Sequence, residues 1–279
     1  MKDVSIPDGV TAYTDFKTVI EDSEIILHVT PSKFFRNTLN GYKEFVNGQP
    51  IIICSKGFEA DSLMTLDDII KEEMPGVKFG VLSGPSHAEE VSIDMPTAMV
   101  VASEDDELNN RLANILKSDT MRIYTSNDVK GVELGGGLKN IIAFCAGVLK
   151  GLGLGDNSFA ALITRGLTEI SRIGVVLGGK KDTFYGLTGL GDLIVTCASE
   201  HSRNRRAGIL IGQGNTIEET REKVGMTIES IDNIEVAYKL AKKYDVDVPI
   251  INTVYNVLYN KLNPKDGVIQ LMRRDLKQE

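Results

Sequence analysis

Lys139 follows three consecutive glycines, Gly135–Gly137, inside a segment with a helical pattern. Each glycine in a helix costs about 1 kcal/mol relative to alanine, so three together indicate a kink, close helix packing or close approach of a ligand. Gly135 and Gly136 lie four and three residues before Lys139, so the helix face leading to its amine carries no side chains. A ligand along that face would meet a lysine able to act as general acid or base. The alternative is a tightly packed helix crossing with a solvated lysine.

Two further groups of candidate residues each follow an apolar, strand-like segment. They are Ser55-Lys56-Gly57 and Ser83-Gly84-Pro85-Ser86-His87-Ala88. In open α/β sheets, ligands bind beyond the carboxyl ends of the strands, which places Lys56 where anions arrive. Gly84 permits close approach of the backbone and Ser86 offers a hydroxyl group. The alternative for Lys56 is an ordinary surface lysine, but two such turns at one sheet edge support each other.

A carboxylate and a group of arginines complete the candidate chemistry. Asp192 follows Gly189-Leu190-Gly191, where it would orient Lys139 or a substrate hydroxyl, or else cap a helix. Ser202–Arg206 brings three arginines to a predicted helix start, and positive charge beside free backbone amides suits a phosphate. The alternative there is a solvated basic turn.

The elements that must position these residues fall into two halves. In the first half, short apolar segments alternate with amphipathic ones, which predicts right-handed crossovers and a doubly wound parallel sheet. The expected strands span residues 24–29, 50–54, 78–82, 97–102 and 121–125. From Ser126 onward the helical patterns cover residues 127–148, 158–177, 203–211, 231–244, 250–261 and 265–271. We therefore expect a partial Rossmann-like domain of residues 1–126 and an all-helical substrate domain of residues 127–279.

Composition limits the class of protein. Of 279 residues, 42% are apolar and 25% charged, as in soluble globular proteins, and the net charge of −8 argues against a nucleic-acid-binding protein. No apolar run approaches the roughly 18–20 residues of a membrane span, and no secretory leader is visible. Three scattered cysteines indicate reduced thiols in a cytosolic protein. His28 and His201 lack metal-ligand spacing, so no metal site is expected.

These motifs, in this order, resemble the bacterial-type NAD(P)-dependent glycerol-3-phosphate dehydrogenase family from about Val10 to Lys277. The matching pieces are Val29–Ser32, Ser55–Gly57, Ser83–Glu90, Val132–Asn140, Gly151–Gly166, Gly189–Leu193 and Ser202–Arg206. Several motifs at family spacing are more specific than any single one. The resemblance implies a cytoplasmic oxidoreductase that interconverts sn-glycerol 3-phosphate and dihydroxyacetone phosphate with NAD or NADP and feeds glycerophospholipid synthesis.

The resemblance also implies roles for particular residues. Lys139 matches the family's catalytic lysine, which gives a proton to the carbonyl of dihydroxyacetone phosphate and accepts it in reverse. Lys56 matches a lysine that touches both substrate and cofactor. The other implied substrate contacts are Gly84, Ser86, Asp192, Ser202, Arg203 and Asn204, and the other implied cofactor contacts are Ala88, Arg203, Thr227 and Glu229. Thr227 departs from the valine of the family's Val-Val-Glu stretch. A different small hydroxy acid as substrate is disfavoured by the phosphate-ready Ser202–Asn204 group.

One departure concerns the cofactor. The family opens with a strand, a Gly-x-Gly-x-x-Gly turn and a helix that hold the pyrophosphate, and this sequence contains no such motif. By analogy about 50 residues are absent, which would leave the 24–29 strand with an open apolar edge and favour association into a homodimer. Two explanations stay open: the sequence begins at the wrong methionine, or it is a truncated homologue that binds a phosphorylated small molecule without turnover. The choice between NAD and NADP is not readable from these residues.

Overall fold

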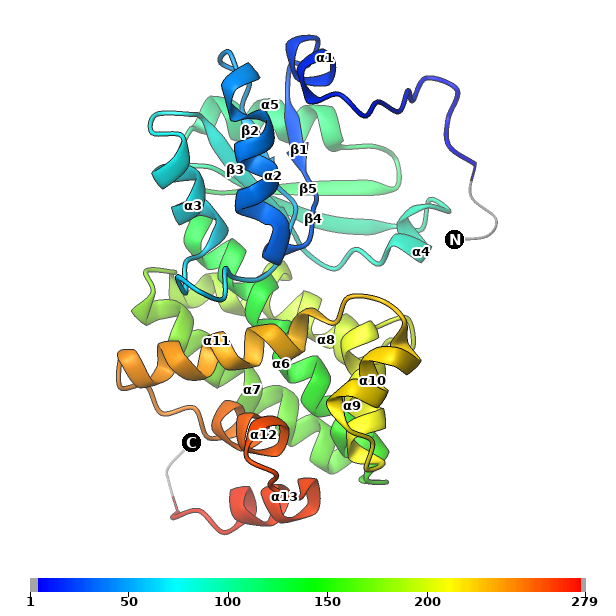
Figure 1. The fold of residues 1–279 in the computed structure, drawn as a ribbon, viewed down its shortest axis with the longest axis vertical. Helices are drawn as coiled ribbons and strands as arrows, with labels where there is room; N and C mark the ends of the chain where they lie inside the picture. The colour runs from blue at the N-terminus through cyan, green and yellow to red at the C-terminus, as the bar shows by residue number, and fades with distance from the viewer. Residues whose placement is uncertain (1–4, 277–279) are drawn as a thin grey trace.

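The computed structural model describes residues 5–276 and has a sheet with its helices at one end and a body of helices at the other (Figure 1). The sheet has five strands in the order β1-β2-β3-β4-β5. They are β1 (Ile26–His28), β2 (Ile51–Ile53), β3 (Phe79–Ser83), β4 (Thr97–Ala102) and β5 (Met121–Ser126). Each overlaps a segment that the apolar pattern predicts to be a strand, so the predicted α/β class, with helices following the sheet, is confirmed.

The strand directions differ from the prediction at one pairing. The pairs β1–β2, β2–β3 and β4–β5 are parallel, whereas β3 and β4 are antiparallel. Between β3 and β4 the chain forms only the helix α4 (Ala88–Val91), which is too short to cross the sheet face and return the chain for a parallel strand. The expectation of an entirely parallel sheet is therefore wrong at β4, and the sheet is mostly parallel.

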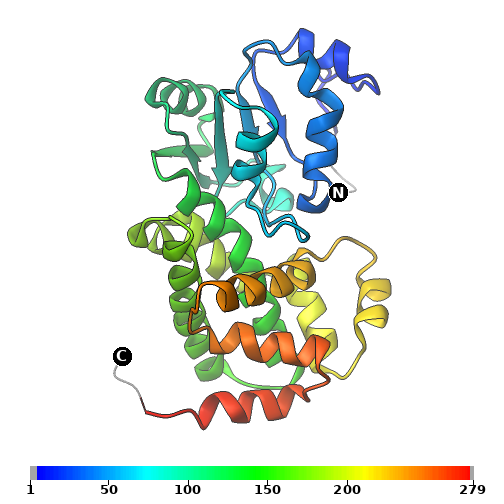
Figure 2. The same ribbon diagram turned by 60° about the vertical axis from the view of Figure 1, so that its left-hand side comes forward.

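Helices cover both faces of the sheet (Figures 1 and 2). They are α1 (Phe16–Glu21), α2 (Phe35–Tyr42), α3 (Leu66–Glu73) and α5 (Asp106–Leu116). Alternate residues of β2 face opposite ways: Ile51 and Ile53 share a core with α2 and α3, and Ile52 shares one with α5. All three isoleucines are fully buried, which explains why this strand is apolar throughout.

The helical body is built round α6, which is 23 residues long and begins three residues after β5 ends. Asp128 is its N-cap, one of the two predicted caps, and accepts a hydrogen bond from Gly131 N at 3.0 Å. The helices are α6 (Val129–Gly151), α7 (Asp156–Val176), α8 (Asp192–Ala198), α9 (Arg203–Gly212), α10 (Ile217–Val224), α11 (Glu229–Lys243), α12 (Pro249–Tyr259) and α13 (Pro264–Met272). The helical patterns predict all of these except the short helices α8 and α10.

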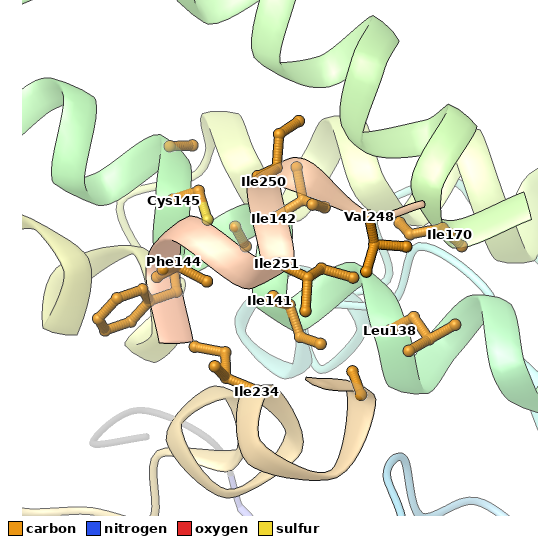
Figure 3. Packing of buried hydrophobic residues seen from close by; sticks show 14 of the residues in the cluster. Leu138, Ile141, Ile142, Phe144, Cys145, Ile170, Ile234, Val248, Ile250 and Ile251 are labelled. Atoms are coloured by element: carbon orange, nitrogen blue, oxygen red, sulfur yellow. The ribbon is translucent and has the colours of Figure 1, made fainter. Parts of the chain in front are cut away.

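The core of the helical body surrounds the C-terminal half of α6 (Figure 3). Ile141, Ile142 and Phe144 of α6 are fully buried against α7, α11 and α12. At the crossing of α6 and α9, Gly147 and Gly208 bring the two backbones together, and a Cβ at Gly208 would overlap the Phe144 carbonyl oxygen. Apolar burial and this close crossing therefore hold the body together.

Two features of the fold matter for what the protein could contact: the apolar helix α6 and the sheet edge at β1. By length and composition α6 could span a membrane, but 94% of its apolar window is buried inside the protein, as in the core helix of a helical domain. Within the part of the chain that the structure describes, β1 pairs with β2 alone. This strand is therefore an edge of the sheet, as expected, and the Leu27 side chain on one of its faces is 49% exposed.

Candidate active site

The carboxyl ends of β2 and β3 meet the N-terminal half of α6. The turn after β2 carries Lys56, whose amine donates a hydrogen bond to the Gly84 carbonyl in the turn after β3 at 3.3 Å. Helix α6 passes close to both turns, because a Cβ at Gly136 would lie 2.7 Å from Ser83 Oγ and 3.5 Å from the Lys56 side chain. The two turns that the sequence predicts to share a sheet edge are therefore side by side.

The three glycines of α6 allow the helix to pack closely against other parts of the chain. A Cβ at Gly135 would lie 2.8 Å from the Thr188 carbonyl oxygen, and one at Gly137 would lie 3.3 Å from Gly57 N. Gly135 and Gly137 thus face backbone, whereas Gly136 faces the side chains of Ser83 and Lys56, so the prediction of a ligand along this face stays a prediction. The alternative is right about packing but wrong about solvation, since Lys139 is only 5% exposed.

Lys139 lies in a buried group of paired charges. Its amine donates hydrogen bonds to Asp192 Oδ1 and, at 2.7 Å, to Thr196 Oγ1. Lys56 donates to the other Asp192 oxygen at 2.7 Å. Asp192 therefore lies between two lysines, and its own side chain is 2% exposed. Gly191 occupies the N-cap position of α8, so Asp192 orients Lys139 and does not cap the helix.

Burial and neighbouring charges shift the proton affinities of this group. Burial, together with the like charge of Lys56, lowers the pKa of Lys139 to about 8, although Asp192 opposes the shift. Burial raises the pKa of the Asp192 carboxyl, but the two lysines outweigh it and hold that pKa below its ordinary value. A lysine with a pKa near neutrality can both give and take a proton under ordinary conditions.

A second carboxyl group, Glu229 at the start of α11, joins the arginine-marked helix to the lysines. Glu229 accepts a hydrogen bond from Asn140 Nδ2 at 3.0 Å. Burial raises the pKa of Glu229, while the charges of Arg203, Lys56 and Lys139 oppose that rise. One carboxyl group therefore feels the charges of all three cations, which supports the prediction that Arg203 and Lys139 share a site.

The predicted anion-binding helix start is present as α9. Ser202 is its N-cap, and its hydroxyl accepts a hydrogen bond from Arg205 N at 3.2 Å. The buried Asn204 accepts one from Ser230 N at 3.1 Å, so its side chain ties α9 to α11. The side chain of Arg203 is exposed and points positive charge to solvent at the start of the helix.

The turn after β3 forms the rim of the site opposite α9. Ser86 donates its hydroxyl hydrogen to the Gly84 carbonyl at 3.1 Å, and Ala88 is the exposed first residue of α4. The rings of His87 and His201 lie 6.3 Å apart between centroids, so this turn reaches the loop that precedes α9. Ser86 and Ala88 therefore lie near the α9 start and have no hydrogen bond to Lys139.

A cavity of about 130 Å³ lies between the carboxyl edge of β1 and the start of α11. Its lining includes Ser32, Lys33, Phe58, Thr227 and Glu229. Next to it, Gly57 has a φ of 132°, and a Cβ there would lie 2.7 Å from Ser32 Oγ. The cavity therefore has mixed polar and apolar walls at the carboxyl edge of the sheet, where ligands of open α/β sheets bind.

Sequence reasoning missed two buried polar residues in this region. Thr196 lies four residues after Asp192 on α8, so the helical period places both on one face, and a helix prediction there would have found it. Glu133 lies two residues before Gly135 and accepts backbone hydrogen bonds from α3, a long-range contact with no local pattern. The turn and helix-start groups, in contrast, come together as predicted.

Comparisons with known proteins agree on one family. The family model described as NAD-dependent glycerol-3-phosphate dehydrogenase N-terminus matches residues 1–109, and its C-terminus model matches residues 128–269. A Clostridium perfringens protein named glycerol-3-phosphate dehydrogenase (NAD(P)+) is 48% identical over 280 residues, covering 100% of this chain and 85% of the relative. A Fusobacterium nucleatum protein of the same name is 47% identical over 282 residues, covering 100% of this chain and 84% of the relative. The crystal structure of glycerol-3-phosphate dehydrogenase from Coxiella burnetii matches with a TM-score of 0.94 at 37% identity, over 98% of this chain and 84% of that one.

Proposed function

The chain belongs to the NAD-dependent glycerol-3-phosphate dehydrogenase family, and we propose that it interconverts sn-glycerol 3-phosphate and dihydroxyacetone phosphate with Lys139 as the acid and base. The observation that carries the assignment of Lys139 is its burial between Asp192 and Thr196 with a pKa lowered to about 8. An enzyme of this class uses NAD or NADP, and a bound reduced nicotinamide supplies the hydride.

The proton chemistry follows from the lysine pair. In reduction, the carbonyl carbon gains hydride while the Lys139 ammonium gives its proton to the carbonyl oxygen, which yields the secondary alcohol. In oxidation, the neutral Lys139 amine takes the hydroxyl proton as hydride leaves the same carbon. Asp192 orients the amine for both directions. Burial and the charge of Lys56 lower the pKa of Lys139 to about 8, so that its proton can be transferred.

The substrate phosphate has a place at the start of α9. Arg203 supplies charge, and Ser202 and Asn204 fix the first turn of that helix. Gly84 and Ser86 belong to the turn whose His87 ring lies 6.3 Å from the ring of His201, just before this helix start, and they are proposed to contact the substrate. Lys56 lies between the two groups and would reach both substrate and cofactor.

For the cofactor, the cavity beside β1 supports a nicotinamide site. Thr227 and Glu229 line that cavity. Lys56, Arg203 and Ala88 are proposed as further cofactor contacts, and the charges of Lys56 and Arg203 act on Glu229 in the cavity wall. The relatives are longer than this chain, which covers 85% of the Clostridium perfringens protein. The proposed cofactor contacts are therefore contacts with the nicotinamide end of NAD or NADP.

The test is turnover by the folded chain. Dihydroxyacetone phosphate should cause oxidation of NADH or NADPH, which is measured as a loss of absorbance. Glycerol 3-phosphate should drive the reverse reaction. A well-folded protein that binds glycerol 3-phosphate in calorimetry but never oxidises either cofactor would replace the enzyme by the alternative, a phosphate-ester binding protein. The buried Lys139–Asp192 pair favours the enzyme, because binding alone needs no lysine with a lowered pKa.

Domain organisation, location and assembly complete the proposal. The boundary is proposed near residue 126, between a Rossmann-like domain of residues 1–126 and a helical substrate domain of residues 127–279. The protein is proposed to act in the cytoplasm on a small phosphorylated substrate, without nucleic acid or a membrane span. The edge position of β1, which pairs with β2 alone among the described strands, supports a homodimer. Light scattering that gives the monomer mass at micromolar concentration would overturn the dimer.

A further inference from the structure

Glu133 caps a helix of the other half of the molecule. Its side chain projects from α6, and its Oε1 accepts a hydrogen bond from Leu66 N at 2.6 Å while Oε2 accepts one from Asp67 N at 3.4 Å. Leu66 is the first residue of α3, and the N-cap residue Thr65 accepts no hydrogen bond from the backbone amides of the helix, because its hydroxyl instead bonds the carboxylates of Asp67 and Asp68. The first amides of α3 therefore find their acceptor on α6, and Glu133 itself is only 3% exposed.

A second residue of α6 makes hydrogen bonds to the same helix start. Lys130, one turn before Glu133, donates hydrogen bonds to Asp67 Oδ1 at 2.6 Å, to Asp68 Oδ1 at 2.8 Å and to Thr65 Oγ1 at 2.6 Å. Asp67 is fully buried between these contacts. Two successive turns of α6 thus hold the first turn of α3, and the N-terminal half of α6 has a fixed position relative to the sheet.

The segment held in this way leads directly from Lys56. Residues 57–65 connect Lys56 to α3, and the bridge between Phe58 and Thr65 closes them into a loop. One end of the loop rests on α6 where Gly57 meets Gly137, and the other end rests on Glu133, one helical turn away. A loop tied at both ends to α6 leaves little freedom for the lysine that precedes it.

We propose that Glu133 is a positioning residue, which acts through this loop to hold Lys56 against Asp192 and beside Lys139. The proposal rests on the dehydrogenase function above and deepens it. Without the Glu133 cap, the start of α3 loses its acceptor, the loop moves, and the ammonium of Lys56 leaves the Asp192 carboxylate. Lys139 then loses the like charge of Lys56, and the Asp192 carboxylate that it bonds is no longer held by Lys56.

The protonation state of Glu133 identifies its conservative substitute. Burial and the adjacent Asp67 raise the pKa of Glu133 well above its ordinary value, although Lys130 opposes the rise. A neutral carboxylic acid at this position accepts a hydrogen bond from Leu66 N and donates its own proton to the Asp67 carboxylate. Glutamine keeps the acceptor for Leu66 N and places an amide donor beside the Asp67 carboxylate, so Glu133→Gln loses only the 3.4 Å contact with Asp67 N and should preserve the shorter bond of the cap.

The chain offers a matched control in Glu169. This glutamate is 2% exposed and caps α12 from α7, accepting hydrogen bonds from Ile250 N at 2.7 Å and Ile251 N at 3.1 Å. It makes the same kind of contact as Glu133 but lies in the helical body, with no link to Lys56. Loss of either cap should destabilise the fold, whereas only loss of the Glu133 cap should alter the chemistry.

The experiment compares Glu133→Ala, Glu133→Gln and Glu169→Ala in the full chain by kinetics, pH profile and amide exchange. Glu133→Ala should lower kcat on the order of ten- to a hundredfold, move the high-pH decline of reduction upward from about 8, and speed amide exchange in residues 57–67. Glu133→Gln should restore kcat to within about threefold of the original chain. Glu169→Ala should lower Tm comparably and change neither kcat nor the decline.

The outcomes separate the two proposals. An unmutated chain without turnover refutes the dehydrogenase function and leaves amide exchange to test the cap alone. An active chain in which Glu133→Ala keeps kcat and its pH profile, or in which Glu169→Ala alters both equally, overturns the positioning role. Should Glu133→Ala not fold, Glu133→Asp takes its place, because the shorter side chain cannot span the same distance to Leu66 N.

Discussion

The two halves of α6 lie in opposite surroundings. Its N-terminal half, residues 129–140, buries charges and glycines against the sheet, and its C-terminal half, residues 141–151, buries apolar side chains against other helices (Figure 3). The buried polar side chains of the first half have partners: Lys139 pairs with Asp192, and Glu133 accepts hydrogen bonds from the α3 amides. Buried charges contribute little net stability, whereas apolar burial contributes most of it. We infer that the second half of the helix stabilises a fold in which the first half does the chemistry.

The largest expected effect comes from removing the charge at the centre of the first half. Lys139→Ala should lower kcat by roughly 10²–10⁴-fold, because it removes the proton donor. Steady-state kinetics with dihydroxyacetone phosphate and calorimetry with glycerol 3-phosphate measure turnover and binding separately. Turnover close to that of the original chain would mean that another group carries the proton, and the contrast between the two halves of α6 would fail.

The matching change for the second half of α6 lies on α9, which packs against it. Gly208→Ala should destabilise the protein by about 1–3 kcal/mol, because its Cβ would overlap the Phe144 carbonyl where α9 crosses α6. The folded fraction should keep its kcat. Gly9→Ala is the control, since a Cβ there meets nothing within 4 Å. Urea unfolding measures both, and equal stability of the two variants would contradict the close crossing.

A smaller effect concerns pH. Reduction needs the charged form of Lys139, so its rate should fall as pH rises through about 8. Lys56→Met removes the like charge that lowers this pKa, so the fall should move to higher pH, on the order of one unit. Lys181→Met, on the η3 turn (Lys181–Tyr185), is the control. A decline that stays in place or moves to lower pH in Lys56→Met would show that Lys56 does not set the proton affinity.

The smallest effect belongs to charges outside both halves of α6. Arg221 and Asp232 form an exposed ion pair of 3.0 Å between α10 and α11, with side chains 47% and 41% exposed. Arg221→Gln should change the free energy of unfolding by less than about 1 kcal/mol and leave kcat unaltered, because solvent screens the pair. A larger loss in thermal unfolding would show that surface pairs matter here as much as buried packing.

Periodicity and motif order in the sequence predict much of this molecule. The strands, the long α6 and the grouping of Lys56, Lys139 and Arg203 all follow from apolar patterns and from the rule that ligands meet the carboxyl edge of a sheet. The direction of β4 does not follow, because an apolar segment has no polarity of its own and only the short α4 connection decides it.

Contacts between distant segments account for what the sequence does not predict. The purpose of Gly135–Gly137 depends on what lies opposite, and the sequence does not reveal that Thr188 and Gly57 do. The same is true of Glu133, whose partners precede it by 66 and 67 residues. Thr196 is a different case, since it follows Asp192 by one helical turn and a helix assigned there would have exposed the pair.

The continuity of α6 also has a consequence for protein engineering. Chimaeras of related enzymes are commonly joined at domain boundaries, and the junction between β5 and α6 invites a crossover there. Such a splice would separate Glu133 and Lys130 from the α3 residues that they hold. A hybrid joined at this point contains two unaltered parts but should have low activity, unless the part that carries α3 supplies matching residues at the start of that helix.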